Sequence, residues 1–261
     1  MTALVHVDAF TERPFAGNAA AVCLLAEPAE RQWMQALAGE LNLAATAFVW
    51  PAAAVYGLRW FSPTHELRLC GHGTLASAHV LYERGERATD APLAFDAPAG
   101  RLTARKRGQL IELDFPSQPS TAIDPPAVLA EALGQAPVHV ERAELDYLVE
   151  LSSAEAVRAT GPDFAALRSV DARGVIVTAR ADSDDVDFVS RFFAPSVGID
   201  EDPVTGSAHC CLAPYWERVL RKTSMVGKQL SRRGGTVHVE VDGERVRLAG
   251  AAVTVARGEL A

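Results

Sequence analysis

Two short stretches of the chain place glycine next to residues that can move protons. Residues 70–74 read CGHGT and residues 201–207 read EDPVTGS, and each stretch opens a segment with a helical apolar pattern. Glycines at a helix start leave backbone N–H groups accessible, and the helix dipole adds partial positive charge there, so a carboxylate can dock. The first stretch offers Gly73 and Thr74 for this purpose, and the second offers Gly206 and Ser207.

Acid and base candidates stand beside both stretches. Cys70 and His72 belong to the first, and Glu201 and Asp202 belong to the second. Moving a proton next to a carboxylate needs an anion clamp together with a positioned acid or base. Taken singly, Cys70 is also compatible with a small buried residue and Asp202 with a helix N-cap.

Two other kinds of site fit the first stretch less well. Residues 71–76 match G-x-G-x-x-A, but a dinucleotide site needs a second strand about 20 residues on that ends in an acidic residue. A polar loop and short meander strands follow instead. His65, His72 and His79 lie seven residues apart, whereas a helical metal pair needs a spacing of three or four. We therefore expect neither a nucleotide nor a metal.

Composition excludes several classes of protein. The 261 residues are 49% apolar, and 33 Asp and Glu against 25 Lys and Arg give a net charge of −8. Nucleic acids and anionic membranes need clustered cations, so neither is an expected partner. The start of the chain lacks a basic segment, and no 18-residue apolar span occurs. Four cysteines without a C-x-x-C pair favour reduced thiols and a cytoplasmic protein.

The elements that must position these motifs follow from the periodicity. The first half predicts helices at 30–43 and 73–83 and strands at 4–10, 21–25, 46–50, 56–61, 66–69, 93–95, 101–106 and 110–115. Residues 115–127 carry four prolines and read as a linker. The second half predicts a helix at 128–133, a motif and helix from residue 200, and strands at 138–142, 145–151, 175–178, 186–193, 237–241, 245–248 and 252–255.

The strand–motif–helix pattern thus occurs twice. It predicts an α+β protein of two similar lobes, residues 1–116 with the CGHGT motif and residues 117–261 with the EDPVTGSAH motif. Each lobe is organised around one central helix that begins at a glycine.

Whole phrases resemble one known family, the phenazine-biosynthesis (PhzF-like) isomerases, which are relatives of diaminopimelate epimerase and proline racemase. The phrases are VDAFTERPFAGNAAAVCLL (7–25), LNLAATAFVW (41–50), LRWFSPTHELRLCGHGTLASAHVL (58–81), RFFAPSVGIDEDPVTGSAH (191–209) and QLSRRGGTVHVEVDGERVRLAG (229–250). The resemblance implies two pseudo-symmetric lobes, each a curved mixed sheet around a central helix, with the active site between them. It also implies a cofactor-free and metal-free isomerase of small carboxylic acids, with a homodimer as one possible assembly.

The resemblance carries site residues over by position. Gly71, His72, Gly206 and Ser207 would line the carboxylate site at the two helix starts. Asp202 would hold or protonate the substrate, and Asn18 would lie in the wall of the cleft.

One departure bears on the chemistry. The family reads S-E-T-A-F where residues 44–48 read AATAF, so the proton-shuttling glutamate is Ala45 here. The racemase relatives use a cysteine in a similar C-G-x-G phrase, and a thiol at a helix N-terminus can have a lowered pKa. Cys70 with Asp202 is therefore the preferred acid/base pair.

Two further functions remain open. Because alanine can do no acid/base work, the chain could be a family member that binds a small acid without catalysis. A thiol hydrolase that uses Cys70 and His72 is the other, although no orienting acid for the imidazole is defined.

Overall fold

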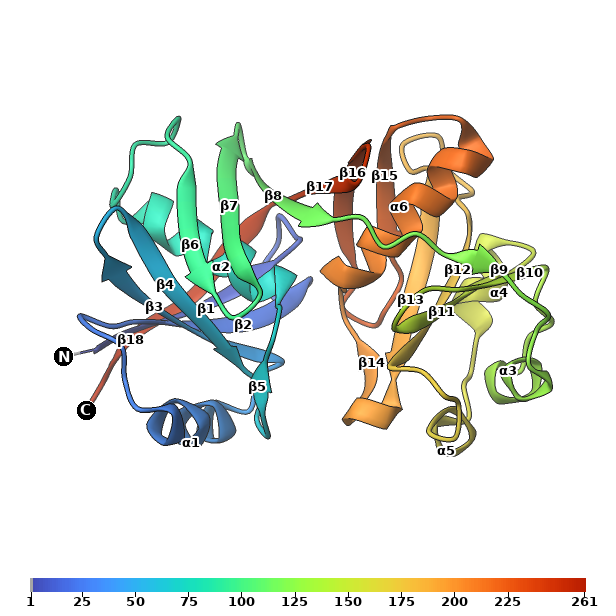
Figure 1. The fold of residues 1–261 in the computed structure, drawn as a ribbon, viewed down its shortest axis with the longest axis horizontal. Helices are drawn as coiled ribbons and strands as arrows, with labels where there is room; N and C mark the ends of the chain where they lie inside the picture. Colours follow the sequence, from blue (N-terminus) through green and yellow to red (C-terminus); the bar gives the residue numbers. More distant parts are fainter. Residues whose placement is uncertain (1) are drawn as a thin grey trace. The chain divides into compact units, whose positions relative to one another are not determined.

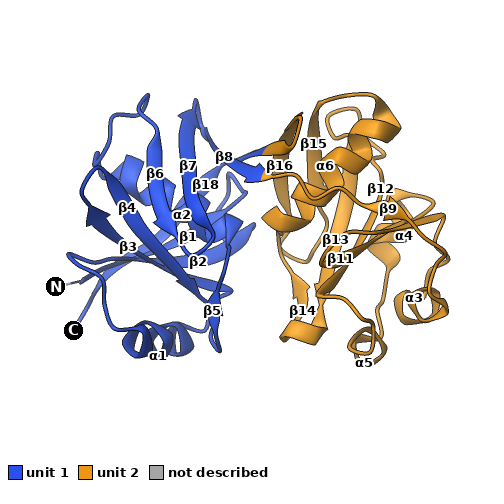
Figure 2. Ribbon diagram, in the orientation of Figure 1, with its two compact units in different colours: residues 1–115, 247–261 blue, residues 116–246 orange. Residues whose placement is uncertain are grey.

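The computed structural model describes residues 2–261, and these form two compact units (Figures 1 and 2). Unit 1 comprises Met1–Phe115 and Arg247–Ala261, and unit 2 comprises Pro116–Val246. Two strands contain the boundaries, namely β8 (Leu110–Pro116) and β17 (Arg245–Gly250).

Unit 1 is built on a mixed sheet with one helix on each face. Its other strands are β1 (Thr2–Ala9), β2 (Asn18–Leu24), β3 (Ala45–Ala52), β4 (Val55–Phe61), β5 (Glu66–Leu67), β6 (Leu93–Ala97), β7 (Gly100–Arg107) and β18 (Ala252–Leu260). The order β18-β1-β2-β3-β4 continues through β6, β7 and β8, and β2–β3 and β4–β6 are the parallel pairs.

The two helices of unit 1 differ because their sequences differ. Helix α1 (Arg31–Leu41) has a single apolar stripe, which packs through Met34 and Ala38 near Phe48 and Phe61. Helix α2 (Gly71–Glu83) is small or apolar nearly all round, and ten of its thirteen residues are buried. A helix of that kind can only be central.

Unit 2 repeats this plan. Its strands are β9 (Thr121–Ala122), β10 (His139–Arg142), β11 (Asp146–Glu150), β12 (Gly174–Arg180), β13 (Phe188–Ala194), β14 (Ile199–Asp202), β15 (Ser224–Gln229) and β16 (Gly235–Asp242). Its helices are α3 (Ala127–Leu133), α4 (Ala154–Ala159), α5 (Phe164–Leu167) and α6 (Gly206–Leu220), with a 3₁₀ turn at Pro195–Val197. Helix α6 is the central one, and nine of its fifteen residues are buried.

The strand pairings of the two units correspond one to one. In unit 1 the pairs β1–β2, β2–β3, β3–β4, β4–β6 and β6–β7 alternate between antiparallel and parallel. In unit 2 the pairs β10–β11, β11–β12, β12–β13, β13–β15 and β15–β16 alternate in the same way. The predicted α+β fold of two similar lobes is confirmed.

The structure differs from the sequence-based expectation at several elements and at one boundary. The short strands β9 and β14 lie in stretches that were read as a linker and as the second motif. Strand β15 was not predicted, because SMVGKQ contains glycine and lysine and shows little alternation. Helices α4 and α5, of six and four residues, are too short to give a helical period. Residues 247–261 were expected in the second lobe, whereas β18 pairs with β1 and this segment belongs to unit 1.

Candidate functional site

The first motif forms the N-terminal turn of α2. Cys70 is the N-cap residue, with an extended backbone, and it is 5% exposed. The N–H of Gly73 donates to the Cys70 sulfur at 3.3 Å, and the Thr74 hydroxyl donates to the Cys70 carbonyl at 2.7 Å. A thiol so placed meets the positive end of the helix dipole and a backbone donor, both of which favour a thiolate.

His72 lies against the same sulfur. Its two ring nitrogens are 3.6 and 3.7 Å from Cys70 Sγ, so the sulfur lies beside the ring rather than in line with one nitrogen. Burial lowers the pKa of His72 to about 4, which leaves the imidazole neutral near pH 7. A neutral ring can donate a hydrogen bond to a carboxylate, but it supplies no positive charge.

Position 45, where the family resemblance implies a glutamate, lies in the sheet under α2. Ala45 begins β3 and pairs with Ala20 of β2, two residues after Asn18. Paired residues and residues two apart in a strand share a face. Ala47 of β3 pairs with Trp60 in the same way, so Asn18, Ala45 and Trp60 lie on one face. All three are completely buried.

Trp60 is the residue of that face that lies closest against Gly73 of α2. A Cβ placed on Gly73 would lie 2.7 Å from Trp60 Cδ1 and 3.0 Å from Cys70 Sγ. Glycine at position 73 is therefore needed for α2 to approach the indole as well as to expose its N–H.

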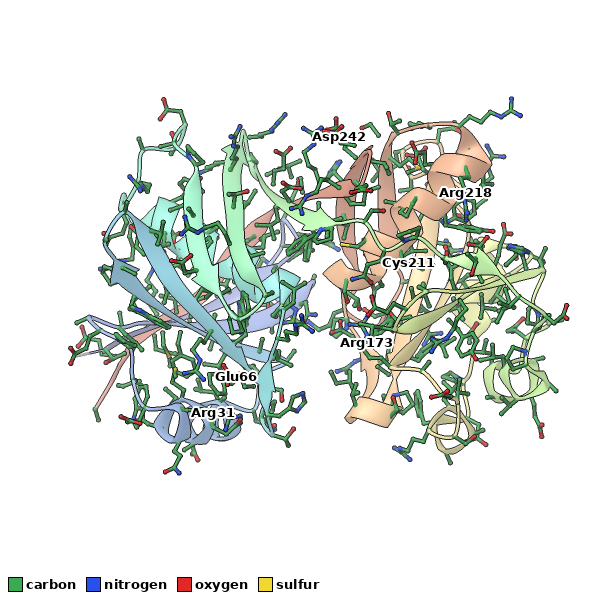
Figure 3. The ribbon with its side chains drawn as sticks, viewed as in Figure 1. Arg31, Glu66, Arg173, Cys211, Arg218 and Asp242 are labelled. Carbon is green, nitrogen blue, oxygen red and sulfur yellow. The ribbon has the colours of Figure 1, made fainter. Side chains whose placement is uncertain are left out.

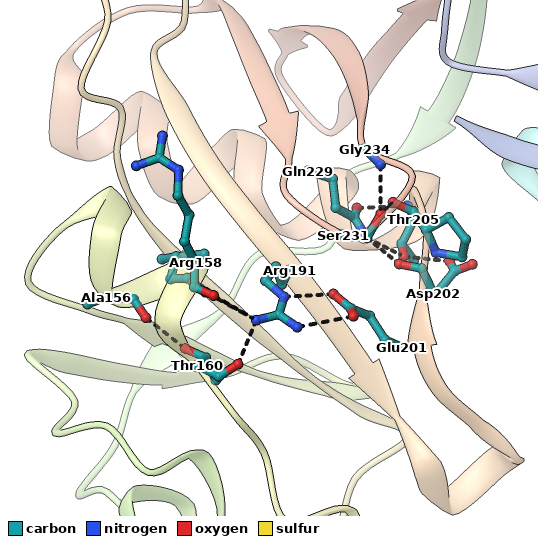
Figure 4. Close-up of polar contacts among 12 residues, drawn as sticks. Ala156, Arg158, Thr160, Arg191, Glu201, Asp202, Thr205, Gln229, Ser231 and Gly234 are labelled. Carbon is teal, nitrogen blue, oxygen red and sulfur yellow. Dashed lines mark hydrogen bonds and ion pairs between the residues drawn. The ribbon is translucent and has the colours of Figure 1, made fainter. Parts of the chain in front are cut away.

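The second motif forms the start of α6, and Asp202 stands just before it. The Thr205 hydroxyl donates to Asp202 Oδ2 at 2.5 Å (Figure 4). The buried amide of Gln229 donates to the Asp202 carbonyl at 2.7 Å and accepts the Thr205 N–H at 2.9 Å. One hydroxyl thus holds the carboxylate of Asp202, and Gln229 holds the backbone of Asp202 and Thr205 just before a fifteen-residue helix.

Glu201 points away from that carboxylate. Its two oxygens accept bonds from Arg191 at 2.7 and 3.1 Å, and Arg191 also donates to the Thr160 carbonyl at 2.6 Å (Figure 4). Successive residues of a strand face opposite sides, so Glu201 and Asp202 cannot serve one site. Glu201 is an ion-pair residue, and Asp202 is the acid/base candidate.

Unit 1 contains the same ion pair. Glu66 is held by Arg59 at 2.7 Å and by Arg31 at 2.9 Å (Figure 3). Arg59 stands two residues before Phe61, and its guanidinium lies 5.3 Å from that ring, as Arg191 lies 4.9 Å from the ring of Phe193.

The two helix starts also correspond. Gly71 and Gly206 are the first residues of α2 and α6, so His72 and Ser207 occupy the second helical position. At the N-cap, Thr205 is the counterpart of Cys70. Four residues on, the ring of His209 donates to the Thr205 carbonyl at 2.8 Å, as Thr74 does to Cys70.

The remaining cysteines are packing residues. All four thiols are buried and free, and burial raises the pKa of Cys23, Cys210 and Cys211 to about 12. Cys211 lies in α6, in the interior of unit 2 (Figure 3). Over residues 2–261 no group of three or more His, Cys, Asp or Glu is arranged to hold a metal ion. The same residues include no helix with the length and hydropathy needed to cross a membrane.

Sequence reasoning missed two residues that shape these motifs. Gln229 is 24 positions from Thr205, and its only signal was its place at the start of the phrase QLSRRGG. Trp60 gave no signal beyond its position in a strand.

The fold occurs in solved structures of racemases. A probable proline racemase from Agrobacterium radiobacter superposes with a TM-score of 0.64 at 14% identity, over 100% of this chain and 93% of that one. At that identity the likeness shows the fold alone. The fold class of this chain is therefore a two-lobed α+β fold, which the probable proline racemase also has.

The family follows from closer relatives. The profile of the PhzC-PhzF family, described as phenazine biosynthesis-like protein, matches residues 7–258. A protein named as an uncharacterized isomerase from Halalkalibacterium halodurans is 48% identical over 260 residues, 99% of this chain and 98% of that protein. A crystal structure of a PhzF-family protein from Enterococcus faecalis has a TM-score of 0.95 at 41% identity, covering 100% of this chain and 99% of that one. The chain belongs to the PhzC-PhzF family.

Proposed function

We propose that this protein is an isomerase or epimerase that moves a carbon-bound proton on a small carboxylic acid without a cofactor. The observation that carries the proposal is the carboxylate of Asp202, which accepts the Thr205 hydroxyl and stands on a backbone that Gln229 holds just before α6. The isomerase names of curated relatives support the reaction class.

The proposal assigns the backbone N–H groups of the helix starts to the substrate carboxylate. These belong to Gly71, Gly206 and Ser207, and the neutral ring of His72 adds a donor. Gly73 and Thr74, expected from the sequence to offer free N–H groups, use theirs within the turn, because they donate to the sulfur and the carbonyl of Cys70. As a proton leaves the neighbouring carbon, negative charge builds on the carboxylate, and preorganised donors stabilise it. Loss of one such donor typically reduces the rate by on the order of 10²–10³.

The proton itself passes between carbon and the two acid/base groups. Cys70, as thiolate, removes it and becomes a thiol, and Asp202, as the protonated carboxylic acid, returns one to the substrate and becomes a carboxylate. In the opposite direction the carboxylate removes the proton and the thiol returns one. Asn18 orients the substrate. The proposal has Cys70 and Asp202 act on one substrate molecule, so the loss of either group should slow exchange.

A second candidate function rests on Ala45. Its methyl group lies on the same buried face as the side chains of Ala20 and Ala47, where the family glutamate would stand. The alternative is a small-acid-binding member of the family that has lost catalysis.

Deuterium wash-in distinguishes the two. The protein is incubated in heavy water with a panel of amino and hydroxy acids, and exchange at carbon is followed by NMR. Asp202→Asn and Cys70→Ser are each expected to reduce exchange by about 10²–10⁴, the usual contribution of general acid–base catalysis. Asp200→Asn is the matched control, because this neighbouring carboxylate is 55% exposed in a surface pair with Arg168.

Each outcome has a defined meaning. Exchange by Asp202→Asn at the parental rate removes Asp202 from the mechanism. Exchange that appears only in Ala45→Glu establishes the non-catalytic alternative for the natural chain.

A further inference from the structure

One buried polar group beside the first motif lacks an acceptor. Trp60 is completely buried, and its indole N–H makes no hydrogen bond within residues 2–261. A buried tryptophan usually finds a partner for this group, as Trp216 does by donating to the Thr178 hydroxyl at 3.0 Å. A buried donor without an acceptor is destabilising, so the N–H of Trp60 needs an explanation that packing does not give.

The corresponding position of unit 2 holds a ring without a donor. Phe192 of β13 directly follows the arginine of the repeated ion pair, as Trp60 of β4 does. A phenyl ring thus fills this place in the unit whose central helix has Thr205 as its N-cap, and an indole fills it in the unit whose central helix has Cys70. The shared architecture therefore does not require an N–H at this position.

The indole lies beside the sulfur of Cys70. A Cβ on Gly73 would be 3.0 Å from Cys70 Sγ, 2.7 Å from Trp60 Cδ1 and 3.2 Å from Trp60 Nε1. A methyl group at this point would touch the sulfur and the indole at once, and glycine leaves the point unoccupied. The sulfur already accepts the Gly73 N–H at 3.3 Å, so the indole N–H stands next to an atom that takes hydrogen bonds.

The groups around this contact carry little charge. Asn18 and Ala45, which share the sheet face of Trp60, do not titrate. His72 faces the sulfur from α2, and its ring is neutral near pH 7 because burial lowers its pKa to about 4. Arg68, the charged residue nearest to the thiol along the chain, is exposed. A thiolate formed here would therefore gain from a further N–H donor.

We propose that Trp60 is a positioning residue for the acid/base chemistry, whose indole N–H donates to the sulfur of Cys70 when Cys70 is a thiolate. A neutral thiol is a weak acceptor, whereas an ionised acceptor makes a shorter and stronger hydrogen bond. The inference rests on the proposed function, in which Cys70 removes the proton from carbon as a thiolate.

The pKa of Cys70 is the first readout. The ultraviolet absorbance of the thiolate is titrated between pH 5 and pH 10 as the difference from the matching Cys70→Ser protein. The other three thiols stay protonated in this range, because burial raises their pKa to about 12. We expect Trp60→Phe, which keeps a ring and removes the N–H, to raise the pKa of Cys70 by roughly one unit, the value of one charge-assisted hydrogen bond.

Trp216→Phe is the matched control. It also removes a buried indole, but the N–H of Trp216 is bonded within unit 2, so the pKa of Cys70 should not change. An unchanged pKa of Cys70 in Trp60→Phe overturns the inference. So does an equal rise in Trp216→Phe, because that result would show a general effect of lost packing.

A second readout leaves Trp60 in place. In the parent, the NMR resonance of the Trp60 indole N–H should move downfield with its midpoint at the pKa of Cys70, and in Cys70→Ser it should not move over the same range. A resonance that does not follow the thiol, or a parent in which Cys70 does not titrate below pH 10, overturns the inference.

Deuterium exchange separates this inference from the proposed function. In Trp60→Phe, exchange at carbon should fall about tenfold below the pKa of Cys70 and recover above it, because the thiolate fraction recovers with pH. An equal loss at every pH would mark a purely structural role for Trp60 and overturn the inference. Exchange by Cys70→Ser at the parental rate would instead remove Cys70 from the proposed function, and with it the catalytic role of Trp60, whatever the two titrations show about the contact.

Discussion

At the scale of single residues, burial sets the charge state of the first motif. Burial lowers the pKa of both His72 and His209 to about 4, so both rings are neutral in the folded protein near pH 7. A neutral His72 supplies no positive charge to Cys70. The favourable contacts of the Cys70 sulfur are then the Gly73 N–H and the dipole of α2.

This charge state makes stability depend on pH. The pKa of His72 is about 6.5 in the unfolded chain and about 4 in the folded one, so the unfolded chain binds more protons between these values. Stability is complete above pH 6.5 and falls as the pH drops toward 4. We expect His72→Gln, which cannot charge, to lose less stability between pH 7 and pH 5 than the parent in urea unfolding. Equal losses in both proteins would show that His72 is not protonated on unfolding.

At the scale of elements, the start of α6 depends on a side chain from another strand. Gln229 of β15 bonds both the Thr205 N–H and the Asp202 carbonyl, two backbone groups at the buried start of this helix. A buried backbone group left unpaired costs about 1–3 kcal/mol.

Replacement of the Gln229 amide should therefore lower stability and disturb the position of Asp202. We expect Gln229→Leu to lower the free energy of unfolding by about 2–5 kcal/mol, because two buried groups lose their partners. Lys228→Leu, at the exposed neighbouring position, should change it by less than about 0.5 kcal/mol. Urea unfolding of both variants checks the prediction, and similar values for the two would contradict the assigned role of Gln229.

The contact between α2 and β4 gives another prediction at this scale. In Gly73→Ala the added methyl would lie 2.7 Å from the buried ring of Trp60, and overpacking of this kind costs about 1–3 kcal/mol. Alanine has a higher helix propensity than glycine by about 1 kcal/mol, which offsets the lower end of this overpacking cost but not the upper end. Gly161→Ala meets nothing within 4 Å and serves as the control. Thermal unfolding should show a lower Tm for Gly73→Ala alone, and a Tm at or above the parent's would mean that the indole moves aside freely.

At the scale of the whole molecule, two units share one plan and differ in chemistry. Both contain an Arg–Glu pair over a phenylalanine and a side chain that donates to the N-cap carbonyl of the central helix. The N-cap is Cys70 in one unit and Thr205 in the other, and only the second unit adds an aspartate beside it. Equivalent scaffolds thus present unlike side chains at the two helix starts, a thiol in one unit and a hydroxyl with a neighbouring carboxylate in the other.

The repeated ion pair allows a direct comparison of the units. The side chain of Arg191 is 13% exposed, against 26% for Arg59. Removing the glutamate charge from each pair therefore leaves the more buried, and costlier, unpaired charge at Arg191. We expect Glu201→Gln to destabilise by about 1–3 kcal/mol and Glu66→Gln by less. Urea unfolding of the two single variants measures both losses. A larger loss for Glu66→Gln would contradict the inference that the pair with the more buried arginine contributes more to stability.

The sequence by itself determined the two central helices and their glycine-rich starts, whereas the N-cap residues, Cys70 and Thr205, came from the structure. The helices and their starts are local features, because helical period and glycine act within a few positions of the chain. The repeat of the motif and the family phrases extended that local information to the fold of two similar lobes.

Only the tertiary structure decided what holds each of the two adjacent carboxylates. The family resemblance favoured Asp202 over Glu201, and the pairing of β14 with β13 turns Glu201 toward Arg191 and Asp202 toward Thr205. The contact of Gln229 with α6, of Trp60 with Gly73 and of β18 with β1 likewise join residues far apart in the chain. Such pairings depend on the register and packing of whole strands, which no local pattern of residue types specifies.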